Sequence, residues 1–237
     1  MTPTARSRAL KRLWDRRVEG WSDTVESSPV FAVLRSRLLE LAQPQPADRC
    51  LDLGAGSGFL TIPLAQQTAN VHAVDLSAGM LASLRAQADQ TGDVTITTQI
   101  GDMAGVAFAP ASYDLVVSAY AMHYLLDPQK LILLRRAYDW LAPGGRLLVS
   151  DMMLGRSLDQ HHRRVFADKA GAMLRHGPAG WWRLAKNIGR IALKRGRLHP
   201  CTPAWWSNAL TEAGFTHVTY EHVSSEAGIV RGQVRSR

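Results

Sequence analysis

A glycine-rich turn followed at a set distance by an acid is the part of this sequence with the most recognisable chemistry. Residues 51–58 read LDLGAGSG, in which an acid, Asp52, is followed by three glycines. A second apolar run, 70–75, ends in Asp75, 21 residues after Gly54. Glycines let the main chain approach a ligand, and an acid at the end of the next strand can bind ribose hydroxyls. The pattern predicts a nucleotide site at the carboxyl end of a parallel sheet; alternatively, Asp75 is only a turn residue at a strand end.

The spacing of the glycines argues against a dinucleotide. A G-x-G-x-x-G fingerprint that begins at Gly54 needs its third glycine at position 59, where this chain has Phe59. A pyrophosphate uses that third glycine and the helix N-terminus behind it. An acid within the turn, Asp52, suits a ligand with a cationic end rather than a diphosphate. The sequence therefore disfavours an NAD-type ligand.

Five motifs, in order along the chain, resemble those of the class I S-adenosylmethionine-dependent methyltransferases. The resemblance is strongest to the small-molecule branch, which includes the ubiquinone- and menaquinone-type enzymes. The motifs are DLGAGSG (52–58), Asp75, GDM (101–103), YDLVVSAYAMHYL (113–125) and LAPGGRLLVSDM (141–152). They cover roughly residues 47–152, under half of the chain. The resemblance implies transfer of a methyl group from S-adenosyl-L-methionine to a small-molecule acceptor, whether on oxygen, nitrogen or carbon.

The resemblance also implies which residues bind the cofactor. Asp52 would help to hold its amino-acid end, Asp75 its ribose and Asp102 its adenine. Met103 would pack on the adenine, with ordinary core packing as the alternative, and residues 118–119 would face the sulfonium. The full set is Asp52, Gly54, Ala55, Gly56, Gly58, Asp75, Leu76, Asp102, Met103, Ser118 and Ala119.

His123 is the candidate catalytic residue because it follows the predicted strand 113–119, where donor and acceptor should meet. A histidine there can act as a general base on a hydroxyl or an amine; the alternative is that it only packs and hydrogen-bonds. The family branches that methylate nucleic-acid amino groups or glutamine carry an Asn-Pro-Pro-Tyr segment at this place, and this chain has none. His161 and His162 are adjacent, so their rings cannot face one ion from one helix face, and no metal site is predicted.

Length and composition are typical of one α/β domain with an added element. The chain has 237 residues, a net charge of +8 and only two cysteines, Cys50 and Cys201, without metal-binding spacing. No apolar stretch has the length of a signal peptide or of a membrane helix, so a cytoplasmic location is expected. Nothing in the sequence indicates the oligomeric state.

The positive charge is concentrated outside the motif region. Residues 156–197 contain 11 Lys/Arg against two acids, and residues 181–197 place a basic stripe opposite an apolar face. Such a helix can cover an active site with its charges in solvent, lie on an anionic membrane, or grip a nucleic acid, in falling order of preference. A rival hypothesis is therefore a methyltransferase-fold protein that attaches to membrane lipid or nucleic acid, with a lipid-like or RNA substrate or without catalysis.

Strands separated by helices predict a mostly parallel α/β sheet, and the resemblance implies a Rossmann-like sheet of seven strands whose last strand is antiparallel. Helices are predicted at 5–19, 29–42, 58–67, 78–90, 128–141 and 202–213, and strands at 49–53, 70–75, 94–100, 113–119, 145–151, 216–223 and 226–234. Four regions follow: N-terminal helices covering the site (1–46), the cofactor-binding core (47–151), a basic helical lid (152–201), and the last helix with the closing hairpin (202–237).

Overall fold

The computed structural model describes residues 4–92, 94–153, 198–224 and 227–236. Most of the predicted lid, including the helix 181–197, and the histidines at 161, 162 and 176 lie outside the described residues. The strands are β1 Arg49–Leu53, β2 Asn70–Asp75, β3 Ile96–Ile100, β4 Tyr113–Ala119, β5 Leu141–Met152, β6 Thr216–His222 and β7 Ala227–Gln233. The helices are α1 Ala5–Asp15, α2 Val18–Ser27, α3 Pro29–Ala42, α4 Thr61–Ala65, α5 Ala78–Thr91, α6 Asp127–Trp140 and α9 Pro203–Glu212, with a 3-10 turn, η1, at Met122–Tyr124.

The seven strands form one sheet in the order β3-β2-β1-β4-β5-β7-β6. Strands β1 to β5 are parallel, and β7 runs antiparallel to both of its neighbours, β5 and β6. This confirms the predicted Rossmann-like fold and its closing hairpin. The order reverses direction between β1 and β4, and open α/β sheets bind their ligands beside such a reversal, outside the carboxyl ends of the strands.

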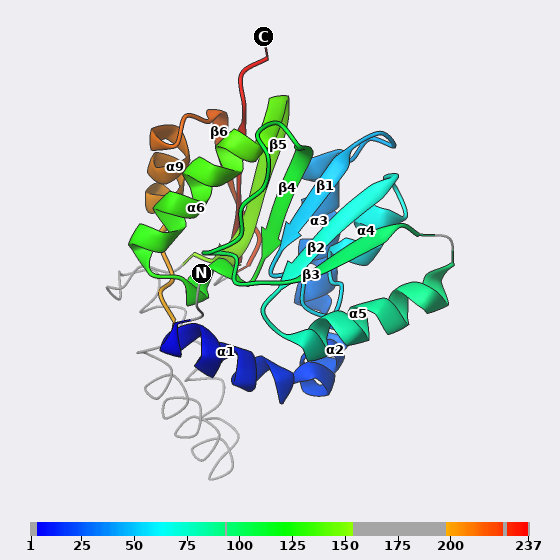
Figure 1. Ribbon diagram of the computed structural model, residues 1–237. Coiled ribbons are helices and arrows are strands. Elements are labelled where there is room, and N and C mark those ends of the chain that lie inside the picture. Colours follow the sequence, from blue (N-terminus) through cyan, green and yellow to red (C-terminus); the bar gives the residue numbers. More distant parts are fainter. Residues whose placement is uncertain (1–3, 93, 154–197, 225–226, 237) are drawn as a thin grey trace, which may run out of the picture.

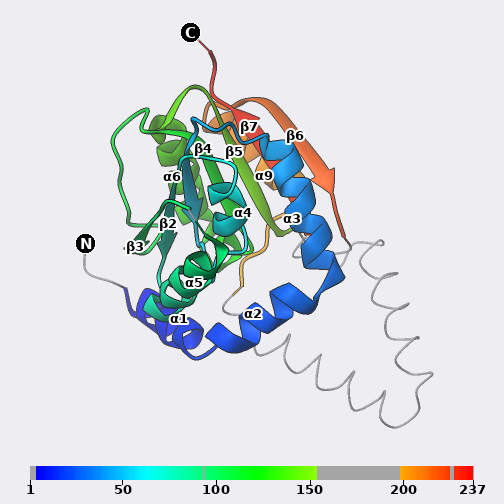
Figure 2. The same cartoon turned by 90° about the vertical axis from the view of Figure 1, so that its right-hand side faces the viewer.

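Helices cover both faces of the sheet (Figures 1 and 2). On one face α3 and α4 bury Leu34, Leu38 and Leu64 against alternate residues of the strands. On the other face α6 and α9 bury a cluster that includes Trp140 and Trp206, which is 1% exposed. Because side chains alternate across a strand, each β residue contributes to only one of these layers. This packing fixes where the strands end. It therefore also fixes the positions of the two acids at the carboxyl ends of β1 and β2.

The N-terminal segment differs from its prediction. The single helix expected over 5–19 is wrong: α1 ends at Asp15, and α2 begins at Val18 in a new direction. The amide of Arg17 donates to the Trp14 carbonyl at 2.9 Å, three residues back, which closes the turn between the two helices. Figure 1 shows α1 lying across one edge of the sheet, while α2 leads to α3. The break lets both short helices cover the same edge.

Two core boundaries also shift. The helix predicted at 58–67 is shorter, because the backbone still turns at Gly58 and α4 begins at Thr61. The strand predicted at 145–151 begins earlier, at Leu141, so the turn expected at 143–145 is instead an irregularity within β5. Pairing there jumps from Tyr113–Leu141 to Leu115–Arg146. Glycine at 144 permits the jump with its φ of +79°.

Candidate active site

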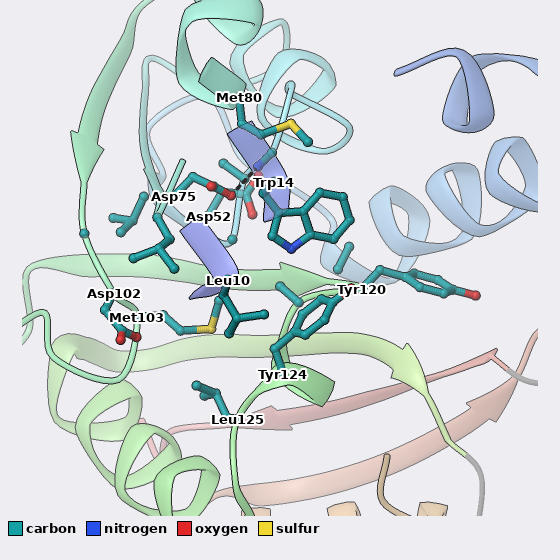
Figure 3. A pocket seen from close by; sticks show the side chains of 18 of the residues that line it. Leu10, Trp14, Asp52, Asp75, Met80, Asp102, Met103, Tyr120, Tyr124 and Leu125 are labelled. Carbon is teal, nitrogen blue, oxygen red and sulfur yellow. Dashed lines mark hydrogen bonds between the residues drawn. The ribbon is translucent and has the colours of Figure 1, made fainter. Parts of the chain in front are cut away.

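A cavity lies at the carboxyl ends of β1, β2 and β4, where the strand order reverses. Its empty space is about 1040 Å³, part of it open to solvent. The glycine-rich turn, three acids, the residues after β4 and the N-terminal helices all line it. Figure 3 shows Asp52 and Asp75 close together and Asp102 beside Met103, with Trp14 and Tyr124 on the side of the cavity away from Asp102.

The glycine-rich turn crosses from β1 to the end of β2. The amides of Gly54 and Ala55 both donate to the Val74 carbonyl, at 2.8 and 3.1 Å. Gly54 has a φ of +78°, and a Cβ there would lie 2.3 Å from the Cβ of Ala121. Only glycine allows the turn to pack this closely under the loop after β4. The turn therefore presents bare main chain to the cavity, as the sequence predicted.

Asp75 ends β2 and has its carboxylate fixed by main-chain donors. The Gly56 amide donates to Oδ2 at 2.9 Å, and the Ser77 amide donates to Oδ1 at 2.8 Å. Burial raises the pKa of Asp75, while these amides act in the opposite direction. Each carboxylate oxygen can accept more than one hydrogen bond, so Asp75 can still accept from a ligand hydroxyl. Asp75 can thus be both the turn residue of one hypothesis and the ligand-binding residue of the other.

Asp52 is a buried acid at the end of β1, only 2% exposed. Its Oδ2 accepts a hydrogen bond of 2.7 Å from the Thr61 hydroxyl, the first residue of α4. Burial, together with a smaller effect of the negative charge of Asp75, raises the pKa of Asp52 to about 7. A buried acid of this kind gains most from a cationic ligand group, because a nearby positive charge stabilises its ionised form.

Asp102 follows β3 and is bound from above by α1. The Ser7 hydroxyl donates to Asp102 Oδ2, and the Ala104 amide donates to Oδ1 at 3.0 Å. Ser7 is 5% exposed, and its own amide donates to the N-capping hydroxyl of Thr4 at 3.1 Å. The cap of α1 and the predicted adenine-binding acid therefore form one hydrogen-bonded unit.

A chain of aromatic rings runs along the rest of the cavity. Trp14 packs edge-on against Tyr124 (5.8 Å between centroids) and Trp21 (5.4 Å), and Trp21 packs edge-on against Phe31 at 5.5 Å. Phe31 in turn packs against Tyr120 at 4.9 Å. All five line the cavity. Such edge-to-face pairs hold rings in fixed positions, so this wall is apolar and ordered.

The structure brings most of the predicted site residues to the cavity, but not all. Gly58 faces Ile62 and Leu84 instead of the cavity. Ser118 is buried, and its hydroxyl donates to the Leu53 carbonyl at 2.7 Å, so it ties β4 to β1. The residues that line the cavity as predicted are Asp52, Gly54, Ala55, Gly56, Asp75, Leu76, Asp102, Met103 and Ala119.

His123 lies behind the cavity wall. Its Nδ1 is 2.5 Å from Asp151 Oδ1, its side chain is 6% exposed, and its ring packs against Tyr124 at 4.2 Å between centroids. Tyr124 lines the cavity, whereas His123 is not among the described lining residues. This geometry supports the packing hypothesis better than the general-base hypothesis.

The sequence predicts that N-terminal helices cover the site, but not which of their residues reach it. Ser7, Leu10, Trp14 and Trp21 line the cavity, yet none belongs to a recognised motif. The available signal was the seven-residue spacing of the two tryptophans, which is two helical turns. The sequence does not show that the chain breaks between them, or that both helices reach the sheet edge.

Comparison with known proteins agrees with this geometry. The sequence model of a family described as a methyltransferase domain matches residues 50–145, the region of the glycine-rich turn and both acid-bearing strands. The aklanonic acid methyltransferase DauC of Streptomyces sp. (strain C5) is 31% identical over 120 residues, which cover 49% of this chain and 54% of that protein. Residues 50–145 are thus identified as a methyltransferase domain, and the relatives support a class I S-adenosylmethionine-dependent methyltransferase. The cofactor of this class is S-adenosyl-L-methionine.

Two further similarities extend beyond the core of this methyltransferase. A demethylmenaquinone methyltransferase of Corynebacterium efficiens is 25% identical over 217 residues, covering 89% of this chain and 88% of that one. A phosphoethanolamine N-methyltransferase 2 structure of Haemonchus contortus, in complex with S-adenosyl-L-methionine, has a TM-score of 0.73 at 16% identity, covering 99% of this chain and 61% of that one. The second likeness shows the fold alone. The methyltransferase spans about half the length, or less, of relatives such as DauC.

Within the described residues, no helix is long and apolar enough to cross a membrane. The same residues contain no group of three or more His, Cys, Asp or Glu side chains that could hold a metal ion.

Proposed function

We propose that this methyltransferase transfers a methyl group from S-adenosyl-L-methionine to a small, largely apolar molecule in the cytoplasm. The observation that carries the proposal is the cavity at the strand-order reversal, which is lined by three acids and by a wall of aromatic rings. Relatives named for aklanonic acid and for demethylmenaquinone support a small-molecule acceptor. Both cysteines are free, and the cytoplasm keeps thiols reduced.

The residues present fit the cofactor. S-adenosyl-L-methionine carries a methyl group on a positively charged sulfur, which makes that group transferable. Asp75 would bind the ribose hydroxyls, Asp102 the adenine, and Asp52 the ammonium of the amino-acid end. The main chain at Gly56 leaves room for close approach, since a Cβ there would have its nearest neighbour 3.7 Å away, whereas the space at Gly54 is filled by Ala121 and Met103. Ala119, the last residue of β4, would lie beside the reacting methyl group.

The aromatic wall supports an apolar acceptor and the exclusion of water. Trp14 and Tyr124 project into the cavity (Figure 3), and both have fixed aromatic neighbours. In a cavity closed by such rings, the protein contributes alignment and a dry environment rather than a reactive side chain. An acceptor with an exposed negative charge would have few described partners there, because Arg6 is the only basic residue among the described lining residues.

The first test is cofactor binding by Asp75. Asp75→Ala should weaken S-adenosyl-L-methionine binding by about 1.5–3 kcal/mol, because hydrogen bonds to a charged group are lost. Titration calorimetry measures this, with Asp89→Ala, an exposed acid on α5, as the matched control. Unchanged affinity in Asp75→Ala would overturn the ribose assignment. Equal or tighter binding of NAD by the unmodified protein would overturn the cofactor itself.

The second test identifies the acceptor. The protein is incubated with S-adenosyl-L-methionine labelled in the methyl group and with a metabolite extract of the source organism, and labelled products are identified by mass spectrometry. We expect label in an apolar small molecule. Label confined to RNA or to phospholipid would replace the small-molecule proposal with the attachment hypotheses.

A further inference from the structure

We propose that Trp21 binds the carboxylate of the cofactor's amino-acid end through its indole N–H. This inference rests on the proposed function, since it assigns a further binding residue to the same site. It brings α2, a helix without any methyltransferase motif, into cofactor recognition.

The position of the Trp21 nitrogen is the first observation. A Cβ placed on Gly56 would have Trp21 Nε1 as its nearest neighbour, at 3.7 Å. Gly56 has a φ of +56°, and its amide donates to Asp75 Oδ2 at 2.9 Å. The glycine-rich turn therefore has the predicted ribose-binding acid on one side and an indole N–H on the other. A cofactor held by Asp75 extends its amino-acid end along this turn.

The second observation is that the Trp21 ring is held in place and its donor is available. Its ring packs edge-on between Trp14 and Phe31, at 5.4 and 5.5 Å. The next residue, Ser22, donates to the Ser57 hydroxyl at 3.0 Å, which fastens α2 to the glycine-rich turn. The hydrogen bonds of the described residues include none from the Trp21 N–H, although this side chain lines the cavity.

The charges around the cavity explain why a donor is needed at this place. The three acids that line the cavity favour the ammonium and sulfonium groups of the cofactor and repel its carboxylate. The carboxylate must therefore point away from Asp52 and Asp75, toward N–H donors. Near Trp21, Phe59 lines the cavity and has the Arg35 guanidinium over its ring, 5.9 Å from the centroid. This end of the cavity thus combines a neutral donor with a neighbouring positive charge.

The test compares two ligands that differ only in the carboxylate, S-adenosyl-L-methionine and its decarboxylated form, by titration calorimetry. In Trp21→Phe, which keeps an aromatic ring, the Kd for the first should rise about tenfold or more, the loss expected for a hydrogen bond to a charged group. The Kd for the decarboxylated form should change by less than about twofold, because that ligand never made the contact.

Trp14→Phe is the matched control, since Trp14 belongs to the same aromatic chain but is proposed only to pack. It should shift both Kd values by the same factor, so the ratio of the two separates a carboxylate contact from general damage to the wall. An equal effect of Trp21→Phe on both ligands would overturn the inference while leaving the proposed function intact. Failure of the unmodified protein to bind either ligand would overturn the proposed function instead.

A spectroscopic measurement on the unmodified protein adds an independent check. With 15N-labelled tryptophan, the Trp21 indole N–H resonance, assigned through Trp21→Phe, should move downfield on addition of S-adenosylhomocysteine, which retains the carboxylate. Addition of 5′-methylthioadenosine, which lacks the amino-acid end, should leave it near its free position. Identical shifts with both ligands would contradict the contact.

Discussion

At the scale of single residues, the site depends on acids that are buried before any ligand binds. Asp52 is the clearest case, because burial raises its pKa to about 7 although Thr61 donates to it. Folding without the cofactor therefore favours the protonated form of Asp52. A cationic group placed beside it reverses that preference, which couples the ionisation of Asp52 to cofactor binding.

This coupling predicts a specific pH dependence of stability. An unfolded chain ionises Asp52 near the ordinary pKa of 3.8, whereas the folded chain keeps the proton until about pH 7. Between these values the unfolded state has lost the proton and the folded state has not, so stability falls as pH rises. Asp52→Asn, which has no proton to lose, should exceed the unmodified protein in stability by about 2–4 kcal/mol above pH 7.

Urea unfolding without cofactor, at about pH 4.5 and pH 8, measures this difference from the pH dependence of the midpoint. We expect the advantage of Asp52→Asn to shrink toward zero at the lower pH. A stability difference that does not change with pH would show that Asp52 is ionised throughout.

His123 offers a second prediction at the residue scale. Its buried contact with Asp151 and its place behind Tyr124 lead us to expect a structural role. His123→Gln should reduce the free energy of unfolding by about 1–3 kcal/mol, the cost of disturbing a buried hydrogen bond. Cofactor affinity and turnover per folded molecule should stay unchanged. If turnover instead fell about 100-fold or more at unchanged stability, His123 would be the general base.

At the scale of elements, α1 is the part that converts an open sheet edge into a closed cavity. Ser7 fastens its first turn to Asp102, and Asp15 at its end accepts from the Ser77 hydroxyl at 2.6 Å. Ser77 caps α5 and follows Asp75, so the two ends of α1 are bound next to the predicted adenine and ribose sites. Cofactor binding and the docking of α1 should therefore stabilise each other.

Removal of one fastening tests this coupling. Ser7→Ala deletes the hydroxyl that donates to Asp102, so the amides of residues 5–15 should exchange with solvent about tenfold faster or more, consistent with the loss of about 1–2 kcal/mol of docking. Addition of S-adenosylhomocysteine should slow exchange in both proteins. Ser27→Ala, an exposed serine at the end of α2, is the control. Unchanged exchange in Ser7→Ala would mean that packing of Leu10 and Trp14 alone holds α1.

At the scale of the whole molecule, the net charge of +8 is the property that separates the proposed enzyme from a membrane-attached protein. Many of the basic residues fall within 156–197, outside the described residues. If the segment 181–197 only covers the site, its charges are solvated and worth little individually. We therefore expect no binding to vesicles that contain anionic phospholipid at physiological salt.

Vesicle sedimentation measures this at low and at physiological salt. Replacing Lys186, Arg190 and Lys194 with Gln should leave activity on a soluble acceptor nearly unchanged. Salt-dependent binding that disappears in this triple variant, at about 1 kcal/mol for each basic residue, would contradict the prediction and favour a lipid-like substrate.

The sequence by itself determined the central layer of the molecule and its cofactor chemistry. Alternating apolar runs and helical spacing predicted the seven strands, since these signals are local and each strand carries its own. The same holds for the glycine-rich turn, because the φ of +78° and the close packing at Gly54 require glycine. The predicted boundaries were wrong at the start of α4 and at the start of β5. There the boundary is set by a turn or by an irregular strand pairing, and the hydrophobic periodicity of the sequence carries no signal for either.

Only the tertiary structure decided which residues complete the site. Ser7, Trp14 and Trp21 reach the cavity because the chain turns between Asp15 and Val18 and folds back over the sheet edge. This change of direction depends on contacts with α5 and with the glycine-rich turn, which are many residues away in the sequence. No local sequence pattern therefore predicts it. For the same reason the sequence could not place Ser118 or His123: which side of a strand end faces the cavity is set by the packing of its neighbours.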